Sequence, residues 1–259
     1  MSIPINVIVP SRQQKKQIEF LTRAIASIEK QNIPTEYEII VTVAVDKGCE
    51  LEKSILNKLN VQCVASERSS QAAALNTGID TIKDGYVAFL EDDDQWEQNF
   101  LHNAFMHLES SDFISSTQAE YNEKGAFVRI NDFPTPSGWF MRAETLHLVG
   151  KFNEEFKFHI DNEWLGRLRQ KSAKRVHLIE ATAPVDEKYC RQVRPWLSNV
   201  INLSDGQCVL KRHTSPYPLV RRLVHENSGI ASIARDPNLQ QISSTEILRL
   251  REMFGTIPW

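Results

Sequence analysis

The sequence has little of what several common protein classes require. Its four cysteines are scattered and form no CxxC pair, which argues against a cysteine-based zinc site and favours free thiols in a reducing compartment. No run approaches the ~20 apolar residues that span a bilayer, and Met1 to Pro10 lacks the regions of a signal peptide. The net charge of −3 gives no reason to expect nucleic acid as a partner. We therefore expect a cytoplasmic protein without a transmembrane segment.

Glycine is missing where phosphate-binding loops usually need it. The first predicted strand is followed by Pro10-Ser11-Arg12-Gln13-Gln14, and no GxGxxG follows any strand. A dinucleotide-dependent dehydrogenase needs that pattern, so the sequence disfavours this class. A nucleotidyltransferase would share an α/β layout and a carboxylate–metal site, but it too would normally show a glycine-rich loop here. We keep the nucleotidyltransferase as an alternative.

What the sequence does contain is a regular alternation of strand and helix signals. Hydrophobic residues make up 41% of the chain, which is enough for a sizeable core. Short β-branched runs alternate with segments whose apolar residues recur at helical spacing. Such repeated units predict an α/β fold with a mostly parallel central sheet flanked by helices. The predicted strands are 5–9, 38–45, 61–65 and 86–90, and the predicted helices are 17–30, 49–59, 70–82 and 98–108.

The second half of the sequence is less regular. Its signals predict strands within 112–130 around a turn at 123–125, a loop at 134–138 and a further strand at 176–179. Beyond Pro184 further prolines interrupt the pattern. The helices predicted in this half are 142–149, 161–169, 219–223 and 245–253.

Polar residues follow three of the predicted strands, namely Pro10-Ser11-Arg12, Asp46 and the Glu-Asp-Asp-Asp run at 91–94. Ligands gather at the carboxyl ends of parallel strands, so we expect these residues to face one crevice. Four consecutive acids repel one another unless a cation lies among them. Mg²⁺ and Mn²⁺ prefer carboxylate and phosphate oxygens. The run predicts a divalent metal site, against the alternative of a solvated loop in which Asp94 caps the next helix.

These strand ends belong to a larger set of segments that, taken in order, resemble the family 2 glycosyltransferases with the GT-A fold. The acidic run with its trailing Trp96 is similar to the Asp-x-Asp-Asp motif of that family. The resemblance covers about the first two thirds of the chain. The matching segments are 5–12, 37–48, 72–79, 86–96, 149–154 and 161–168.

The resemblance implies metal-dependent, inverting transfer of a sugar from a nucleoside diphosphate donor to an acceptor hydroxyl. Mn²⁺ or Mg²⁺ would neutralise the charge that develops on the leaving diphosphate. The resemblance places Asp93 on the metal and Glu91 near the ribose. Glu91 or Asp94 is expected as a second ligand, with Asp94 the weaker candidate because it would cap the next helix, and His213 as a third. The plainer alternative for His213 is a structural or surface histidine.

The resemblance also implies a set of donor-binding residues. Asp46 looks like the residue that accepts a hydrogen bond from the nucleobase, although a strand-end turn explains an acid there equally well. Arg68 would contact the diphosphate or pair with an acid. The expected donor-binding residues are Pro10, Ser11, Arg12, Asp46, Arg68, Asn76, Glu91 and Asp92.

The acceptor hydroxyl needs a general base, and the last matching segment offers Asp161 for this role. Glu163 is the second candidate, and Asp161 would also serve as a helix cap. Trp139 follows a Pro/Gly loop, where we expect it either to stack on a sugar or to pack in the core.

The sequence also departs from the family pattern. Glu91 stands where the family usually has Asp, Lys47 replaces the second Asp of an Asp-Asp pair, and Ser69 and Ser70 stand where Gly is frequent. Asp161 lacks a preceding Glu. These differences leave open the donor, the sugar and a non-catalytic protein that binds a nucleotide sugar.

We divide the chain into a nucleotide-sugar-binding half at 1–110, an acceptor-binding half of the same domain at 111–185 and a C-terminal helical extension at 186–259. The expected partners are a nucleotide sugar and a carbohydrate or other hydroxyl acceptor. A late basic group would hold a phosphate, contact an anionic membrane peripherally or form a solvated face. Its members are Lys211, Arg212, Arg221 and Arg222.

Overall fold

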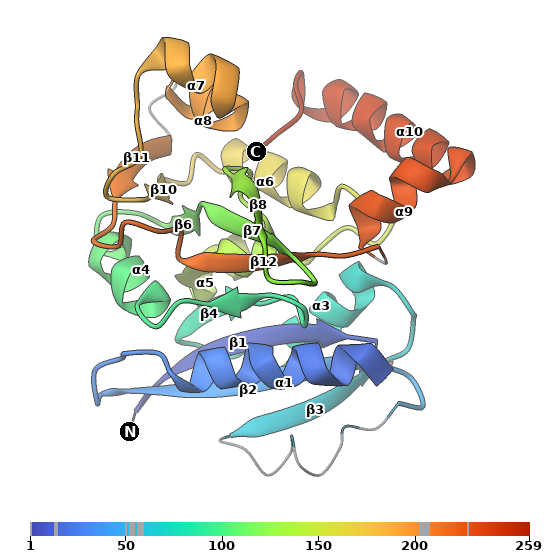
Figure 1. The fold of residues 1–259 in the computed structure, drawn as a ribbon. Coiled ribbons are helices and arrows are strands. Elements are labelled where there is room, and N and C mark those ends of the chain that lie inside the picture. The colour runs from blue at the N-terminus through green and yellow to red at the C-terminus, as the bar shows by residue number, and fades with distance from the viewer. Residues whose placement is uncertain are drawn as a thin grey trace.

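The fold is built on two β-sheets, one large and one small, with helices on both sides of the large one (Figure 1). All four cysteines are free thiols. No helix in the described part of the chain is both long and apolar enough to cross a membrane. The predicted helix at 49–59 lies largely outside the described residues. The computed structural model describes residues 2–12, 15–49, 51, 55, 60–201, 208–226 and 228–259.

The large sheet confirms the predicted α/β class. Its order is β11-β10-β6-β9-β4-β1-β2-β3, and neighbouring strands run parallel except where β9 meets β4 and β6. β-branched runs suit the central strands because helices cover both of their faces. The strands are β1 (Ile3–Ser11), β2 (Tyr37–Asp46), β3 (Val61–Ser66), β4 (Tyr86–Phe89), β6 (Phe113–Ser116), β9 (Phe140–Arg142), β10 (Arg175–Ile179) and β11 (Cys208–Arg212).

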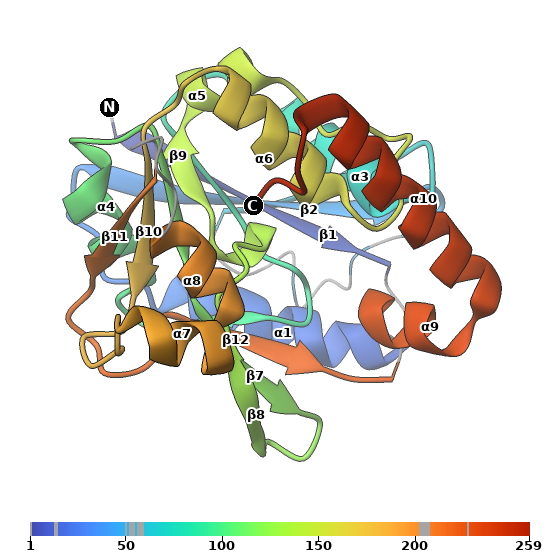
Figure 2. The same ribbon diagram turned by 90° about the horizontal axis from the view of Figure 1, so that it is seen from above.

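Alternating side chains of the strands build a core on each face of this sheet. On β1, Val7 and Val9 belong to one hydrophobic cluster with Leu21 of the first helix, whereas Ile8 belongs to a second cluster with Leu75. Figure 2 shows the two helical layers on opposite sides of the strands. One layer contains α1 (Lys15–Glu29) and α4 (Phe100–Leu108), and the other contains α3 (Gln71–Ile79), α5 (Ala143–Val149) and α6 (Ile160–Gln170).

The small sheet has the order β5-β12-β7-β8. β7 (Gln118–Asn122) and β8 (Phe127–Asn131) form a hairpin around the predicted turn, where Gly125 has a φ of +76°. β12 (Val220–Val224) runs parallel to β7 and antiparallel to β5 (Gln95–Trp96). The helix predicted at 219–223 is therefore wrong. The backbone of this segment forms hydrogen bonds with two neighbouring strands. This pairing outweighs the helical spacing of its apolar residues.

The last part of the chain is not purely helical, because β11 and β12 extend the two sheets. The helix predicted at 245–253 is confirmed as part of a longer one, α10 (Pro237–Phe254), which lies beside α6 (Figure 2). The contact is close, since a Cβ atom on Gly166 would lie 2.6 Å from the ring of Phe254. The other late helices are α7 (Glu187–Val193), α8 (Pro195–Ile201) and α9 (Gly229–Arg235).

Candidate active site

The carboxyl ends of β1, β2 and β4 meet at one edge of the large sheet. β1 pairs with β2 so that Ser11 faces Val45, and it pairs with β4 so that Ile8 faces Phe89. This register brings Ser11, Asp46 and residues 91–94, which we call the acidic turn, to the same edge. In sheets of this kind the edge is the usual ligand-binding side.

The acidic turn gathers carboxylates into a compact group. One oxygen each from Glu91, Asp93 and Asp94 lies within 4.8 Å of the others. Asp94 is buried, and both of its oxygens already accept hydrogen bonds, Oδ2 from Ser137 Oγ at 2.6 Å and Oδ1 from the backbone N–H of Leu223 at 3.1 Å. Asp94 therefore ties the short 3₁₀ helix η1 (Pro136–Gly138) and β12 to the turn. Asp93 stays partly exposed.

Asp92 is buried beside β1, where Ser11 forms a hydrogen bond to it and Arg12 adds positive charge. Burial, followed by the charge of Asp93, raises the pKa of Asp92 to about 7. Its Oδ2 atom is buried and has no hydrogen-bond partner. Leaving a buried carboxylate oxygen without a partner is costly. A ligand or cation at this edge would supply the missing interaction, so the residues present fit a bound metal.

The carboxylates of the acidic turn disfavour one another's ionised forms. Burial, then the charge of Asp93, raises the pKa of Glu91, and Arg222 offsets this only in part. Burial, then the charges of Asp93 and Glu91, raises the pKa of Asp94 well above its usual range. The described protein groups therefore supply too little positive charge for a fully ionised turn. A divalent cation would favour ionisation of all these groups.

Arg222 lies near the acidic turn, although the sequence analysis grouped it with three other basic residues. Lys211 and Arg212 of that group lie in β11, and Arg221 stacks over the ring of Tyr121 at 4.2 Å. Arg222 instead acts on the acidic turn. Burial alone would lower its pKa, but the carboxylates around it raise that pKa. The four basic residues therefore do not form one surface.

His225 is a second residue that the sequence reasoning missed. It follows β12, and its Nε2 atom lies 2.9 Å from Asp93 Oδ2. This hydrogen bond is the main reason that the pKa of His225 is raised. The late histidine that the sequence analysis predicts as a metal ligand is His213, not His225. No local signal separates the two histidines, because His213 and His225 each follow an apolar and basic run.

His213 lies in a different environment. It is buried, its backbone N–H donates to the carbonyl of Ile179, and its Nδ1 accepts from the N–H of Ser215 at 3.2 Å. Burial lowers its pKa to about 4. Among the described residues, the group suited to hold a metal contains Glu91, Asp93 and Asp94 but not His213.

Asp161 lies in the first turn of α6, near the acidic turn. Burial raises its pKa, while the N–H of Asn162, which donates to Oδ1 at 2.8 Å, and the charge of His159 partly offset this. The charge of Asp161 in turn raises the pKa of Glu91, and Arg222 acts on both groups. The carboxylate of Asp161 thus lies near enough to the acidic turn for the charges of the two to influence each other.

Glu163 and Trp139 make contacts inside the fold. Both carboxylate oxygens of the buried Glu163 accept hydrogen bonds from Arg167, at 2.8 and 2.9 Å. This arrangement favours Asp161 over Glu163 as a proton acceptor. Trp139 is fully buried and stacks on Phe152. Of the two roles predicted for Trp139, the core role is the one that the structure shows.

Asn76 and Arg68 both contact the loop that contains Phe152 and Glu154. The Nδ2 atom of Asn76 donates to the carbonyl of Phe152 at 2.9 Å, and its Oδ1 atom accepts from the N–H of Phe152 at 2.8 Å. Arg68 pairs with Glu154 at 2.6 Å, but its side chain is 73% exposed. Asn76 thus stabilises the loop here, whereas Arg68 remains accessible to an anionic ligand.

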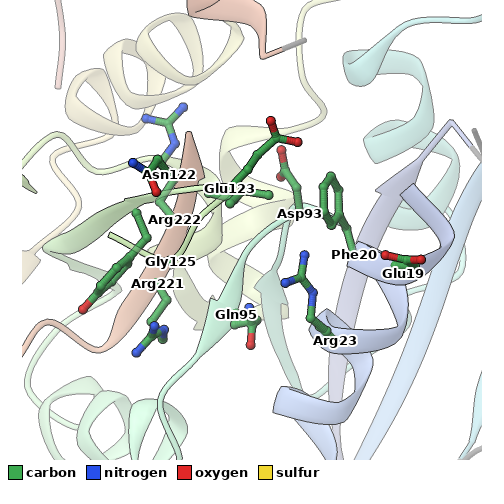
Figure 3. A pocket seen from close by; sticks show the side chains of 12 residues that line it. Glu19, Phe20, Arg23, Asp93, Gln95, Asn122, Glu123, Gly125, Arg221 and Arg222 are labelled. Atoms are coloured by element: carbon green, nitrogen blue, oxygen red, sulfur yellow. The ribbon is translucent and has the colours of Figure 1, made fainter. Parts of the chain in front are cut away.

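A cavity of about 320 Å³ opens beside Asp93 (Figure 3). It lies between α1, the β7–β8 hairpin and β12. Figure 3 shows Asp93 close to Phe20 and Arg23 of α1, with Glu123 of the hairpin opposite them. The open space leaves the carboxylate of Asp93 accessible to a ligand.

Comparisons with known proteins agree with this geometry. The sequence profile described as Glycosyl transferase family 2 matches residues 6–168. No curated protein sequence matches the chain. Among solved structures, S. aureus TarS aligns with a TM-score of 0.56 and 16% identity, over 97% of this chain but only 43% of TarS.

Two further structures with bound ligands are similar. TarS 1–349 in complex with UDP-GlcNAc has a TM-score of 0.57 and 17% identity, over 96% of this chain and 67% of that one. Mannosyltransferase PcManGT from Pyrobaculum calidifontis, in complex with GDP-Man and Mn²⁺, has a TM-score of 0.53 and 16% identity, over 76% of this chain and 60% of that one. At such identities the likeness shows the fold, and that fold is the GT-A type expected from the sequence.

Proposed function

The chain belongs to glycosyl transferase family 2, and from this premise we propose that it transfers a sugar from a nucleoside diphosphate to an acceptor hydroxyl. One observation carries the proposal: oxygens of Glu91, Asp93 and Asp94 converge within 4.8 Å where parallel strands end. The leaving diphosphate becomes more negative as its bond to the sugar breaks. A group of carboxylates that holds a divalent cation at this point would lower the barrier.

Asp93 is the central residue of the proposed metal site. Its Oδ2 atom already lies 2.9 Å from the ring nitrogen of His225, so both side chains can turn toward one ion. Glu91 completes the set, as a ligand or as a contact to the ribose. Asp94 is better explained as the support that holds β12, and with it His225, against the turn. When bound, Mn²⁺ or Mg²⁺ would neutralise charge on the diphosphate.

The nucleoside is proposed to lie along the ends of β1 and β2. Ser11 and Asp46 lie at this edge, and the Arg12 side chain is exposed there. Asp46 can accept a hydrogen bond from a base N–H. Arg12 and Arg68 offer guanidinium groups that match phosphate oxygens.

Asp161 is proposed as the general base. Its carboxylate shares the site with Glu91, and burial raises its pKa, which strengthens it as a proton acceptor near neutral pH. It would accept the proton of the acceptor hydroxyl while that oxygen attacks the anomeric carbon. A single displacement of this kind inverts the configuration at that carbon.

The proposed site draws on all three segments of the chain. Residues 1–110 would bind the donor, and 111–185 would supply the base and contact the acceptor. Residues 186–259 contribute Arg222 and His225. We further propose that the protein acts in the cytoplasm, in keeping with its four free thiols.

The proposal can be tested with UDP-GlcNAc and GDP-Man as donor probes, each with Mn²⁺ and with EDTA. We expect one of them to be cleaved to its nucleoside diphosphate and the free or transferred sugar, and only when the metal is present. A nucleotidyltransferase would instead release pyrophosphate from a nucleoside triphosphate. A protein that only binds nucleotide sugars would show metal-dependent binding without cleavage. Either of those results would contradict the proposed transfer.

A further inference from the structure

Helix α10 lies outside the segment matched by the family profile, yet it contacts the start of the helix that carries Asp161. α6 has no side-chain cap of its own, because His159 at its N-cap position makes no capping hydrogen bond. The first N–H groups of a helix lack intrahelical partners and need acceptors from elsewhere. The three N–H groups just before α6, at residues 157–159, likewise have no helical partner, and their acceptors come from α10.

The acceptors come from Glu246 of α10, a carboxylate that is only 7% exposed. Its Oε1 atom accepts from the backbone N–H of Lys157 at 2.6 Å. Its Oε2 atom accepts from the N–H groups of Phe158 and His159, at 3.0 and 3.1 Å. One side chain therefore fixes three consecutive peptide groups immediately before α6. Its negative charge also lies near the positive end of the α6 dipole, where it stabilises the helix.

Two more contacts from the same C-terminal region hold the residues on either side of Asp161. The His159 ring lies 2.8 Å from Ser243 Oγ of α10 and 3.1 Å from Asn162 Oδ1. The Asn162 side chain in turn donates to the carbonyl of Pro258 at 2.6 Å. The backbone of Asp161 is thus held on both sides by groups that follow residue 240.

We propose that Glu246 is a positioning residue for Asp161: by fixing the backbone that enters α6, it sets the place of the base relative to the acidic turn. The inference rests on the proposed function, in which Asp161 takes the acceptor proton. A base must lie within hydrogen-bond reach of that proton, and a displacement of about 1 Å costs about 10²-fold in rate. The C-terminal helix therefore contributes to turnover without touching substrate.

The test is Glu246→Gln, which keeps the shape of the side chain but turns an NH₂ group toward backbone N–H donors. Turnover is measured as nucleoside diphosphate released from whichever of UDP-GlcNAc and GDP-Man is cleaved with Mn²⁺. We expect kcat to fall about 10- to 100-fold. The KM for the donor should be unchanged, because the proposed donor site lies at the ends of β1 and β2 and not on α6 or α10. Glu252→Gln, an exposed change on the same helix, is the matched control and should leave kcat unchanged.

A double-mutant cycle with Asp161→Asn separates positioning from a general loss of structure. If Glu246 acts through Asp161, then Glu246→Gln causes no further loss of turnover in the Asp161→Asn background. An equal loss in both backgrounds would overturn the proposal. Wild-type turnover of Asp161→Asn would instead refute the base assignment, whatever Glu246→Gln does.

A measurement without substrate completes the test. Hydrogen exchange of the amides of 157–159 should be faster in Glu246→Gln than in wild type and unchanged in Glu252→Gln. If Glu246→Gln does not fold, Ser243→Ala removes a single contact to His159 and should give a smaller fall in kcat with the same unchanged KM. Protected amides together with wild-type kcat would contradict the proposal.

Discussion

Two groups of acids in this molecule differ in how far the described chain supplies hydrogen-bond partners to their carboxylates. In the acidic turn, four carboxylates lie beside Arg222 and His225, and the pKa values of Glu91, Asp92 and Asp94 are raised. The second group, which we call the Arg194 cluster, consists of the buried side chains of Asp132, Glu180 and Arg194. Burial raises the pKa of Asp132 as well, but the hydrogen bonds and charge of Arg194 oppose this.

In the Arg194 cluster one guanidinium donates hydrogen bonds to both acids. The Nε atom of Arg194 donates to Asp132 Oδ2 at 3.0 Å, and its Nη2 atom donates to Glu180 Oε2 at 3.1 Å. Thr117 Oγ1 adds a donor to Glu180 at 3.3 Å. Such a bidentate arrangement supplies the hydrogen bonds that buried carboxylates need.

The difference supports the proposal that the acidic turn binds a ligand and that the second group is structural. The cluster satisfies its carboxylates from within the chain, so it needs no external partner. The acidic turn leaves Asp92 Oδ2 without a partner and Asp93 partly exposed beside a cavity. In the proposed function a divalent cation supplies the positive charge that the acidic turn lacks.

If the comparison holds, changes near the acidic turn alter function, and changes in the cluster alter stability. The largest functional effect is expected for Asp161→Asn, which removes the proposed base. Turnover should fall by about 10²- to 10⁴-fold with donor binding unchanged. Turnover follows from release of the nucleoside diphosphate, and donor binding from calorimetry. Near-wild-type turnover would assign the base to another residue.

The largest stability effect is expected for Arg194→Met, which leaves Asp132 and Glu180 as unpaired buried acids. We expect a loss of about 3–5 kcal/mol in the free energy of unfolding, measured by urea titration. Donor affinity per folded molecule should not change. Lys151→Met breaks an exposed pair with Asp80 and should cost at most about 1 kcal/mol, so it is the control. Equal losses in both variants would show that the buried cluster contributes no more to stability than an exposed ion pair.

A smaller effect concerns the buried histidines near the cluster. Burial lowers the pKa of His177 to about 3 and that of His213 to about 4, from an ordinary value of 6.5. Below pH 6.5 the unfolded chain binds protons that the folded chain does not. Stability should therefore fall as the pH decreases through 6.5, by about 1.4 kcal/mol per pH unit for each histidine. His213→Gln should remove its share of this slope, as measured by urea unfolding at several pH values.

Asp92 of the acidic turn changes the free energy of unfolding with pH in the opposite direction. The pKa of Asp92 is about 7 in the fold and 3.8 as a free group, so the folded chain binds the extra proton between these values. Its contribution to stability is full below pH 3.8 and is lost as the pH rises through 7. Comparing wild type with His213→Gln isolates the histidine slope from this background. An unchanged slope in the variant would contradict a neutral, buried His213.

The sequence predicted the central strands because their pattern is local. β1, β2 and β4 are β-branched apolar runs, and the acids that follow β4 are visible without any structure. β12 could not be recognised in the same way. Arg221 and Arg222 interrupt its apolar pattern, and its strand conformation depends on pairing with β7, in which Val220 faces Gln118.

The structure departs from the predicted site for the same reason at one position, the late histidine. A late histidine was expected, but nothing local distinguishes His213 from His225. His225 reaches Asp93 across 132 positions of sequence, through the contact between Asp94 and the backbone of β12. The role of Glu246 in α10 likewise arises only from tertiary packing.

The most direct test of the central claim is calorimetry of UDP and GDP binding with and without Mn²⁺, on wild type, Asp93→Asn and Asp132→Asn. We predict that Mn²⁺ strengthens nucleotide binding to wild type and to folded Asp132→Asn, and that Asp93→Asn loses this metal dependence. Nucleotide affinity that is the same with and without Mn²⁺ in wild type, or a metal dependence that survives in Asp93→Asn, would contradict the account.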